Sequence, residues 1–161
     1  MQSPVGELIL VAYDTSLRAV LWGDDDSEWK RAAIDRRSVI FQQSAVVEQA
    51  TAQLKEYFVG DRQEFDLPLE PIGTEFQSSV WRSLTEIKFG STVSYSEQAT
   101  SIGRASAVRA VASANGRNPI SIVIPCHRVV AASGGLGGFA GGLDAKRWLL
   151  AHEHELTSAR S

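Results

Sequence analysis

The stretch Asn118–Val130, NPISIVIPCHRVV, contains Cys126, the only cysteine of the 161-residue chain. The apolar residues 119–124 are expected to form a short buried strand. Because Pro125 has no amide hydrogen to donate to a sheet, that strand should end where Cys126 begins. The thiol is therefore expected at the end of an element. There it either fills the core as a small hydrophobic side chain, the usual fate of a lone cysteine, or acts as a nucleophile.

A nucleophilic cysteine needs a base or a cation beside it, because a free thiol has a pKa of about 8.5. His127 follows Cys126 directly, but in an extended chain the two side chains point to opposite faces. Adjacency alone thus does not establish a contact, whereas a turn or a bridging water can provide one. The second ring nitrogen of His127 then needs an acceptor, and Glu153, in a helix expected over 144–153, is a candidate, as is Glu155.

A glycine-rich segment, SGGLGGFAGG at 133–142, follows the cysteine. It contains a G-x-G-x-x-A match over 135–140, but a dinucleotide fold also needs an acidic residue on a further strand about 20 positions later, and only one helix is expected after this loop. The glycines are better explained by a loop whose backbone approaches a planar ligand, with Phe139 as a wall of the pocket.

Three helices are expected before the cysteine segment, and the last two of them are short. A capping box at 74–77 begins a helix that reaches about residue 88. A second capping box at 94–97 begins a short helix that ends before Gly103, and a further helix is expected over 105–115. Two short helices joined by a tight turn have the outline of a helix-turn-helix, and an ordinary helical hairpin is the alternative.

The helix over 105–115 offers a single long hydrogen-bonding side chain, Arg109, among small and apolar residues. Such a surface cannot read a base sequence in the major groove, but it permits close, sequence-tolerant contact with a nucleic-acid backbone or a minor groove. The alternative is a small-residue helix that faces the core and leaves Arg109 in solvent.

The first half of the chain has the pattern of a separate α+β unit. A hairpin is expected from 5–13 and 17–22, a short strand at 39–42, a helix over 45–59 that ends at Gly60, and an extended connector over 65–71. We therefore predict two domains, residues 1–72 and residues 73–161.

Charge is distributed unevenly around a net value of -3. Residues 1–75 hold 7 Lys and Arg against 14 Asp and Glu, whereas residues 76–161 hold 9 against 5. No acidic residue lies between Glu97 and Asp144, a stretch that contains four arginines. This gap favours a local anion-binding face, unless the stretch is simply poor in charge of either sign.

The composition also predicts some absences. No apolar run is long enough to span a bilayer and no secretory signal pattern opens the chain, so a soluble, cytoplasmic protein without membrane contact is expected. One cysteine cannot form an internal disulfide, and three histidines at 127, 152 and 154 do not form a zinc pattern. No metal and no cofactor are expected.

Six segments together resemble the O6-alkylguanine-DNA alkyltransferases, the methylated-DNA–protein-cysteine methyltransferases. They are NPISIVIPCHRVV, GGLGGFAGG, WLLAHE, GTEFQSSVW, VSYSEQA and RAVASANGRNP, and they span most of residues 73–155. SPVGELIL and YFVGDRQEFDLPL resemble the RNase H-like domain of the same family in outline. The resemblance implies an α+β fold, with an N-terminal RNase H-like α/β domain followed by a mostly helical domain that carries a helix-turn-helix and the active-site cysteine.

The same resemblance implies direct DNA repair. The lesion base, O6-alkylguanine or also O4-alkylthymine, is flipped out of duplex DNA, and its alkyl group passes irreversibly to Cys126 in a single turnover. The implied partner is double-stranded DNA carrying alkylated guanine, bound by a monomer that can cluster along the duplex.

Residue roles follow from the matching motifs. Cys126 would be the acceptor, His127 its base through a water and Glu153 the residue that orients His127, while Tyr95 would donate a proton or hydrogen bond to the leaving guanine and Asn118 would brace the turn before the active-site strand. The expected DNA contacts are Arg109, as the finger that replaces the flipped nucleotide, with Ser94, Tyr95, Ala107, Ser113 and Arg128. The expected base pocket comprises Val129, Phe139, Ala140, Asn115 and Leu136, with the Cys126 and Val129 carbonyls and the Ala140 amide reading the base edges.

Two other functions are alternatives to repair. A lesion-binding module would hold alkylated bases without repairing them, but relatives of that kind lack the reactive cysteine. A cysteine hydrolase using Cys126 and His127 would show burst kinetics on small esters, but no oxyanion-hole pattern is evident.

Overall fold

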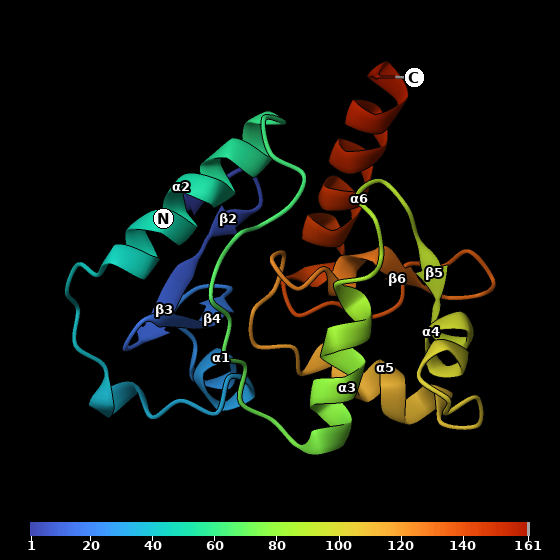
Figure 1. The fold of residues 1–161 in the computed structure, drawn as a ribbon, viewed down its shortest axis with the longest axis horizontal. Coiled ribbons are helices and arrows are strands. Elements are labelled where there is room, and N and C mark those ends of the chain that lie inside the picture. The colour runs from blue at the N-terminus through green and yellow to red at the C-terminus, as the bar shows by residue number, and fades with distance from the viewer. Residues whose placement is uncertain (161) are drawn as a thin grey trace. The chain divides into compact units, whose positions relative to one another are not determined.

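The computed structural model describes residues 1–160, and the chain divides into two units (Figure 1). Unit 1 consists of Met1–Ile72 together with Pro119–Val123, and unit 2 consists of Gly73–Asn118 and the chain from Ile124 onward. The division differs from the boundary expected at residue 72 only in the five residues 119–123. These residues join unit 1 although the chain on either side of them builds unit 2.

Unit 1 begins with a β-hairpin. Its elements are β1 (Gln2–Ser3), β2 (Gly6–Glu7), β3 (Ile9–Tyr13), β4 (Ser16–Leu21), α1 (Asp26–Arg31), the 3-10 helix η1 (Arg36–Ser38) and α2 (Ala45–Val59). Strands β3 and β4 are antiparallel, with Ile9 opposite Leu21 and a bulge between Val11 and Ala12, which confirms the predicted hairpin. Their inner face buries Val11 and Leu21 against Trp29 of α1.

Helix α2 occupies the residues that its periodicity indicated. The Ser44 hydroxyl accepts a hydrogen bond from the amide of Val47, and Gly60 ends the helix with a left-handed φ of 86°. Only glycine adopts that conformation without a steric cost, which explains why the helix ends there. Leu54 and Tyr57 on the inner face are fully buried.

The strand predicted at residues 39–42 is wrong. Val39–Gln42 has no regular secondary structure, and Ile40 and Phe41 are 75% and 79% exposed. A short β-type sequence becomes a strand only where a neighbouring strand supplies hydrogen bonds, and no strand within residues 1–160 pairs with this segment.

The strand predicted at residues 119–124 is also wrong, although its burial is confirmed. The Val20 amide donates to the Pro119 carbonyl at 2.9 Å, and Val20 and Ile120 form a single parallel bridge. The backbone then turns at Ile122, whose φ is 74°. A β-branched residue in that conformation breaks an extended ladder, so the segment is buried as a turn rather than as a strand.

Unit 2 is mostly helical, as predicted. It contains α3 (Glu75–Leu84), β5 (Val93–Ser94), α4 (Tyr95–Ser101), α5 (Val108–Gly116), the 3-10 helix η2 (Cys126–Arg128), β6 (Val129–Val130) and α6 (Gly142–Ala159). Helix α3 ends earlier than expected, α5 begins three residues later, and α6 extends beyond 144–153 at both ends. Within residues 1–160, no helix has both the length and the apolar character needed to cross a membrane.

Both capping boxes are present. The Thr74 hydroxyl accepts from the Gln77 amide at 3.1 Å while the Gln77 side chain accepts from the Thr74 amide, and Ser94 and Glu97 form the same reciprocal pair. These bonds satisfy amides that a helix leaves unpaired at its start. They fix where α3 and α4 begin.

Two contacts order the helices of unit 2. The Trp81 indole of α3 donates to the Ala114 carbonyl of α5 at 2.8 Å. The short parallel pair β5–β6 places Val93 opposite Val129 and Ser94 opposite Val130. As a result, the first turn of α4 lies beside the chain that leaves η2.

We expect Thr74→Ala to lower the free energy of unfolding by about 1 kcal/mol, because the α3 cap and its reciprocal bond are lost. Urea denaturation measures this. Thr100→Ala is the matched control, since the exposed Thr100 hydroxyl bonds only to the Ser96 carbonyl within α4. An equal loss in both variants would contradict the role of the cap.

Candidate active site

Cys126 is the first residue of η2 and is 6% exposed, whereas His127 is fully buried. The Cys126 backbone amide donates to the Ile124 carbonyl at 2.9 Å, and the Asn118 side-chain amide donates to the same carbonyl at 2.8 Å. Asn118 thus contacts the turn that the sequence expected it to brace. These hydrogen bonds hold the backbone at Cys126, and the residue is almost fully buried.

Glu153, on the buried face of α6, organises the residues that follow Cys126. One carboxylate oxygen is 2.8 Å from His127 Nε2, and the other accepts from Arg128 Nε at 2.9 Å and from the Gly90 amide at 3.0 Å. Arg128 Nη2 donates to the first oxygen at 3.0 Å. The carboxylate is 1% exposed, so these bonds replace its hydration.

The electrostatics of this cluster favour a charged Glu153 beside a neutral His127. Burial alone would raise the pKa of Glu153, but the hydrogen bonds from His127 and Arg128 and the charge of Arg128 hold it well below its usual value. Burial lowers the pKa of His127, and the charge of Arg128 adds to that shift against the opposing effect of Glu153. His127 is therefore neutral at neutral pH.

The position of the His127 proton follows from its partner. A carboxylate only accepts hydrogen bonds, so Nε2 carries the proton and Nδ1 has a free lone pair. Nδ1 is buried and has no hydrogen-bond partner among residues 1–160. The ring is thus oriented by Glu153 at one nitrogen and able to accept a proton at the other.

The structure contradicts the expected contact between Arg128 and DNA. The sequence placed it among the DNA contacts, but its side chain is only 7% exposed, and its guanidinium bonds to Glu153 and to the Ile87 carbonyl at 2.6 Å. A guanidinium held on several sides in this way cannot also reach a phosphate. Arg128 therefore belongs to the Glu153 cluster.

Tyr95, the first residue of α4, is half-buried. Burial, and then the charge of Cys126, raises the pKa of Tyr95, so its hydroxyl stays protonated and can donate. The hydroxyl packs against the glycine-rich loop, where a Cβ built on Gly137 would lie 2.4 Å from it. Only a glycine, with a φ of 71°, permits this approach.

The predicted base pocket is brought together only in part. The Phe139 ring lies edge-to-face with His127 at 6.4 Å between centroids, and Leu136, Phe139 and Ala140 are partly buried in the same loop. Asn115 does not lie with these pocket residues. Its side-chain amide is buried between α4 and α5 and bonds reciprocally with Gln98, at 2.6 and 3.2 Å. It stabilises helix packing there.

Lys146 is a residue that the sequence reasoning missed. It is fully buried on α6, and its Nζ donates to the Val129 carbonyl at 2.6 Å and lies 5.8 Å from the centre of the Tyr95 ring. The missed signal was its spacing, because Lys146, Leu149 and Glu153 recur on one helical face. A lysine on a buried face needs a specific reason.

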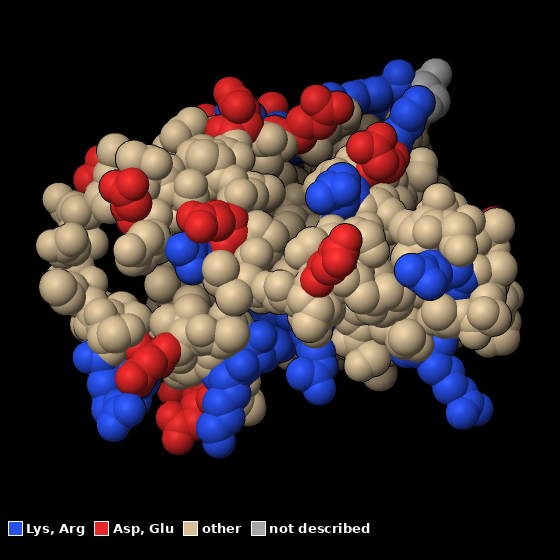
Figure 2. All heavy atoms as spheres, turned by 60° about the horizontal axis from the view of Figure 1, so that its bottom comes forward, with Lys and Arg blue, Asp and Glu red and all other residues tan. Residues whose placement is uncertain are grey.

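Helix α5 has one buried and one exposed side. Val111, Ala114 and Asn115 face inward, while Arg109 and Ser113 are exposed, and Ser94 and Ala107 are partly exposed. Arg104 and Arg117 are exposed at the two ends of α5. In Figure 2, Lys and Arg side chains protrude along the lower edge of the surface. This arrangement can receive an anionic partner.

A hollow of about 1030 Å³ lies in unit 1, lined by β3 and the segment around Ile40 and Phe41. It contains none of the residues around Cys126, so its size does not mark the chemistry. Among residues 1–160, no three His, Cys, Asp or Glu side chains gather in a way that could hold a metal ion.

Comparison with known proteins first identifies the class of protein to which the chain is similar. A family model described as 6-O-methylguanine DNA methyltransferase, ribonuclease-like domain, matches residues 1–71, and one described as 6-O-methylguanine DNA methyltransferase, DNA binding domain, matches residues 75–155. The two models account for the α+β first unit and the helical second unit. The predicted fold class is thereby confirmed.

Individual relatives agree with this class. A methylated-DNA–protein-cysteine methyltransferase of Mycolicibacterium paratuberculosis is 44% identical over 99% of this chain and 93% of its own, and one of Methanosarcina barkeri is 42% identical over 93% and 92%. The crystal structure of a Mycobacterium tuberculosis O6-methylguanine methyltransferase superposes with a TM-score of 0.83 and 40% identity, covering 96% of this chain and 90% of that one. A Mycobacterium tuberculosis OGT in complex with DNA has a TM-score of 0.78 and 37% identity, covering 97% and 91%. The chain belongs to the 6-O-methylguanine DNA methyltransferase family.

We expect Gly137→Ala to destabilise the protein by about 1 to 2 kcal/mol, since a left-handed alanine is strained and its methyl group must displace Tyr95. Urea denaturation and the NMR ring resonances of Tyr95 report the two effects. Gly138→Ala is the control, because a Cβ there meets no atom within 4 Å. Unchanged Tyr95 resonances in Gly137→Ala would contradict the described packing.

We expect Glu153→Gln to lower stability at pH 7 by about 3 kcal/mol, because it leaves the Arg128 guanidinium buried without its counter-charge. The folded-state pKa of Glu153 is depressed, so its contribution is complete above the unfolded value of about 4.3 and is lost as the pH falls below it. The difference from the wild type should shrink in acid, as denaturation curves at several pH values will show. The exposed Glu155→Gln is the control, and a gap that widens in acid would refute the assignment.

Proposed function

We propose that the protein repairs DNA directly, by moving the alkyl group of O6-alkylguanine in duplex DNA onto the sulfur of Cys126 in a single turnover. One observation carries the proposal: Cys126 adjoins a neutral His127 whose Nε2 is fixed by Glu153 at 2.8 Å while its Nδ1 has no partner among residues 1–160. Family membership and the names of the relatives support the same reaction.

The first step is activation of the sulfur. The Cys126 thiol gives its proton to His127 Nδ1 through a water, and the imidazolium that forms is stabilised by the carboxylate of Glu153. Arg128 keeps that carboxylate ionised and oriented, so the proton stays on the imidazole during the step. The thiolate is then the nucleophile.

The second step is transfer at an sp3 carbon. A carbon–sulfur bond forms on Cys126 as the bond between the alkyl carbon and O6 breaks, and the electron pair moves into the guanine ring. Tyr95 donates a hydrogen bond or its proton to the departing guanine, and the proton taken up by His127 restores the balance. The thioether is stable, so each protein molecule reacts once.

Access to the lesion requires base flipping, because the alkyl carbon on O6 of a stacked guanine cannot reach the sulfur of Cys126, a residue that is only 6% exposed. We assign the exposed face of α5 to the duplex, with Arg109 entering the space left by the flipped nucleotide. Ser94, Ala107 and Ser113 permit close approach, and Arg104 and Arg117 are placed to contact phosphates. Unstacking costs a few kcal/mol and costs least for a poorly paired lesion.

The flipped base would lie against the glycine-rich loop, with Leu136, Phe139 and Ala140 as its walls and the Val129 carbonyl at its edge. O4-alkylthymine presents the same alkyl–oxygen bond in a smaller ring and is a second candidate substrate. A monomer that can cluster on DNA and a cytoplasmic location stay predictions from the sequence.

We expect duplex DNA containing O6-methylguanine to add the mass of one methyl group to the protein, with the adduct on Cys126 and a limit of one equivalent. Intact-mass measurement and peptide mapping test this. Cys126→Ala should bind the lesion DNA but gain no mass, and a control variant at the exposed His154, His154→Ala, should react like the wild type. Turnover beyond one equivalent would contradict a suicide reaction, and binding without mass change in the wild type would favour a lesion-binding module.

A further inference from the structure

We propose that Gln98 and Asn115 are positioning residues for the reaction with DNA, because their paired side-chain amides fix the rotation of α5 about its own axis and so set the direction of Arg109. This inference deepens the proposed function and rests on it for the role of Arg109. It assigns a task to a buried polar pair that takes no part in the chemistry at Cys126.

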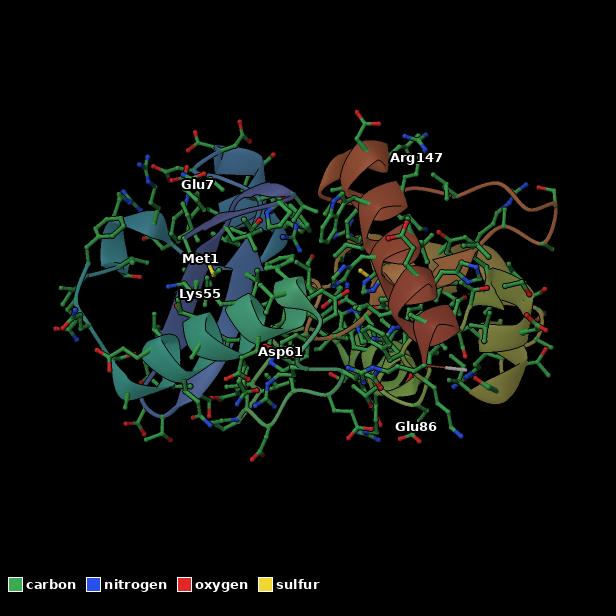
Figure 3. The ribbon with its side chains drawn as sticks, turned by 90° about the horizontal axis from the view of Figure 1, so that it is seen from above. Met1, Glu7, Lys55, Asp61, Glu86 and Arg147 are labelled. Carbon is green, nitrogen blue, oxygen red and sulfur yellow. The ribbon has the colours of Figure 1, made fainter. Side chains whose placement is uncertain are left out.

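The two amides form a closed pair between α4 and α5. Asn115 Nδ2 donates to Gln98 Oε1 at 2.6 Å, and Gln98 Nε2 donates to Asn115 Oδ1 at 3.2 Å. Gln98 Nε2 also donates to the Ser83 hydroxyl of α3 at 3.0 Å. Both amide residues are buried, at 2% and 6% exposure. Helix α4 lies at the outer edge of unit 2 in two views (Figures 1 and 3), so the pair joins its inner side to the neighbouring helices.

Stability alone does not explain two amides at this position. Replacing both members of a buried hydrogen-bonded pair by apolar groups of the same shape is often neutral or stabilising, whereas leaving one member without a partner is costly. An apolar contact would therefore join α4 and α5 about as firmly. The amide pair adds direction, because a hydrogen bond depends on the angle between its partners and a contact between apolar side chains depends on it much less.

The other contacts of α5 constrain its rotation less. Its N-cap residue, Ala107, makes no side-chain cap bond, and the turn from α4 is held by backbone hydrogen bonds. On the inward face, Val111 and Ala114 are compact apolar side chains that still pack after a small rotation. The Trp81 indole ties the Ala114 carbonyl to α3. The amide pair adds a second directional bond, to a second helix, in the same last turn of α5.

The rotation of α5 decides where Arg109 points. Side chains extend to about 5–6 Å from a helix axis, so a rotation of about 10° moves the end of an exposed side chain by about 1 Å. A misplacement of about 1 Å caused by a remote mutation can slow a reaction about 100-fold. Because Tyr95 begins α4, the pair also keeps Arg109, which would enter the duplex, in register with Tyr95, which would meet the flipped base.

The test is the double variant Gln98→Met/Asn115→Leu, which removes both amides and keeps side chains of similar shape. Its urea midpoint should equal or exceed that of the wild type. Its second-order rate of methyl transfer from duplex DNA containing O6-methylguanine should fall by about 10-fold or more. Alkylation of Cys126 by iodoacetamide without DNA should keep the wild-type rate, because the hydrogen bonds of the pair join α3, α4 and α5 and do not reach η2.

Ser83→Ala is the matched control. It removes the hydroxyl on α3 that accepts from Gln98 but leaves the amide pair between α4 and α5, so it should react with the duplex at the wild-type rate. A wild-type rate in the double variant would overturn the proposal. Equal slowing in Ser83→Ala, or a parallel loss of the iodoacetamide rate in the double variant, would overturn it as well.

An exchanged pair decides the outcome if the apolar variant does not fold. Gln98→Asn and Asn115→Gln each change the length of one partner, and each should slow the reaction with the duplex. Gln98→Asn/Asn115→Gln restores a reciprocal pair of the same total length and should recover most of the wild-type rate. Single variants at the full rate, or an exchanged pair no faster than they are, would contradict the positioning role.

Binding of the same duplex, measured by fluorescence anisotropy, separates this inference from the proposed function. The double variant should bind the methylguanine duplex more weakly than the wild type, and equal binding would count against the inference. A wild type that binds the duplex but takes up no methyl group would refute the proposed function. Weaker binding by the double variant would then still support the positioning role of Gln98 and Asn115.

Discussion

One buried carboxylate supports the architecture of unit 2. Glu153 of α6 accepts hydrogen bonds from His127 and Arg128 of η2 and from the Gly90 amide in the loop after α3, and Arg128 extends the connection to the Ile87 carbonyl. Two chain segments far apart in sequence, η2 and the loop after α3, are thereby fixed to one helix. Such a cluster tolerates burial because its carboxylate has a full complement of donors. The backbone that presents Cys126 inherits its rigidity from this cluster.

The same cluster sets the charge state of His127. Arg128 balances the charge of Glu153, so the His127 ring stays neutral and oriented, with its other nitrogen free to accept a proton. Lys146, which is buried on the same helix as Glu153, adds to this effect, because its charge also lowers the pKa of His127.

Local signals in the sequence predicted the helices of both units well. Capping boxes fixed the starts of α3 and α4, and Gly60 fixed the end of α2, because each acts through neighbouring residues. Predictions failed where distant partners decide. Residues 39–42 lack a strand to pair with, and residues 119–124 turn at Ile122.

Side-chain roles divide in the same way. His127 and Glu153 are hydrogen-bonded, in agreement with the motif, but whether Arg128 faces solvent or Glu153, and whether Asn115 faces a ligand or Gln98, depends on tertiary burial that a motif does not encode. Lys146 escaped notice for the same reason.

Finally, the position of Pro119–Val123 within unit 1 has a consequence for biosynthesis. Strand β4 emerges from the ribosome long before the carbonyl of Pro119 to which its Val20 amide donates, so the first unit cannot complete its bonding as an early, self-sufficient domain during translation.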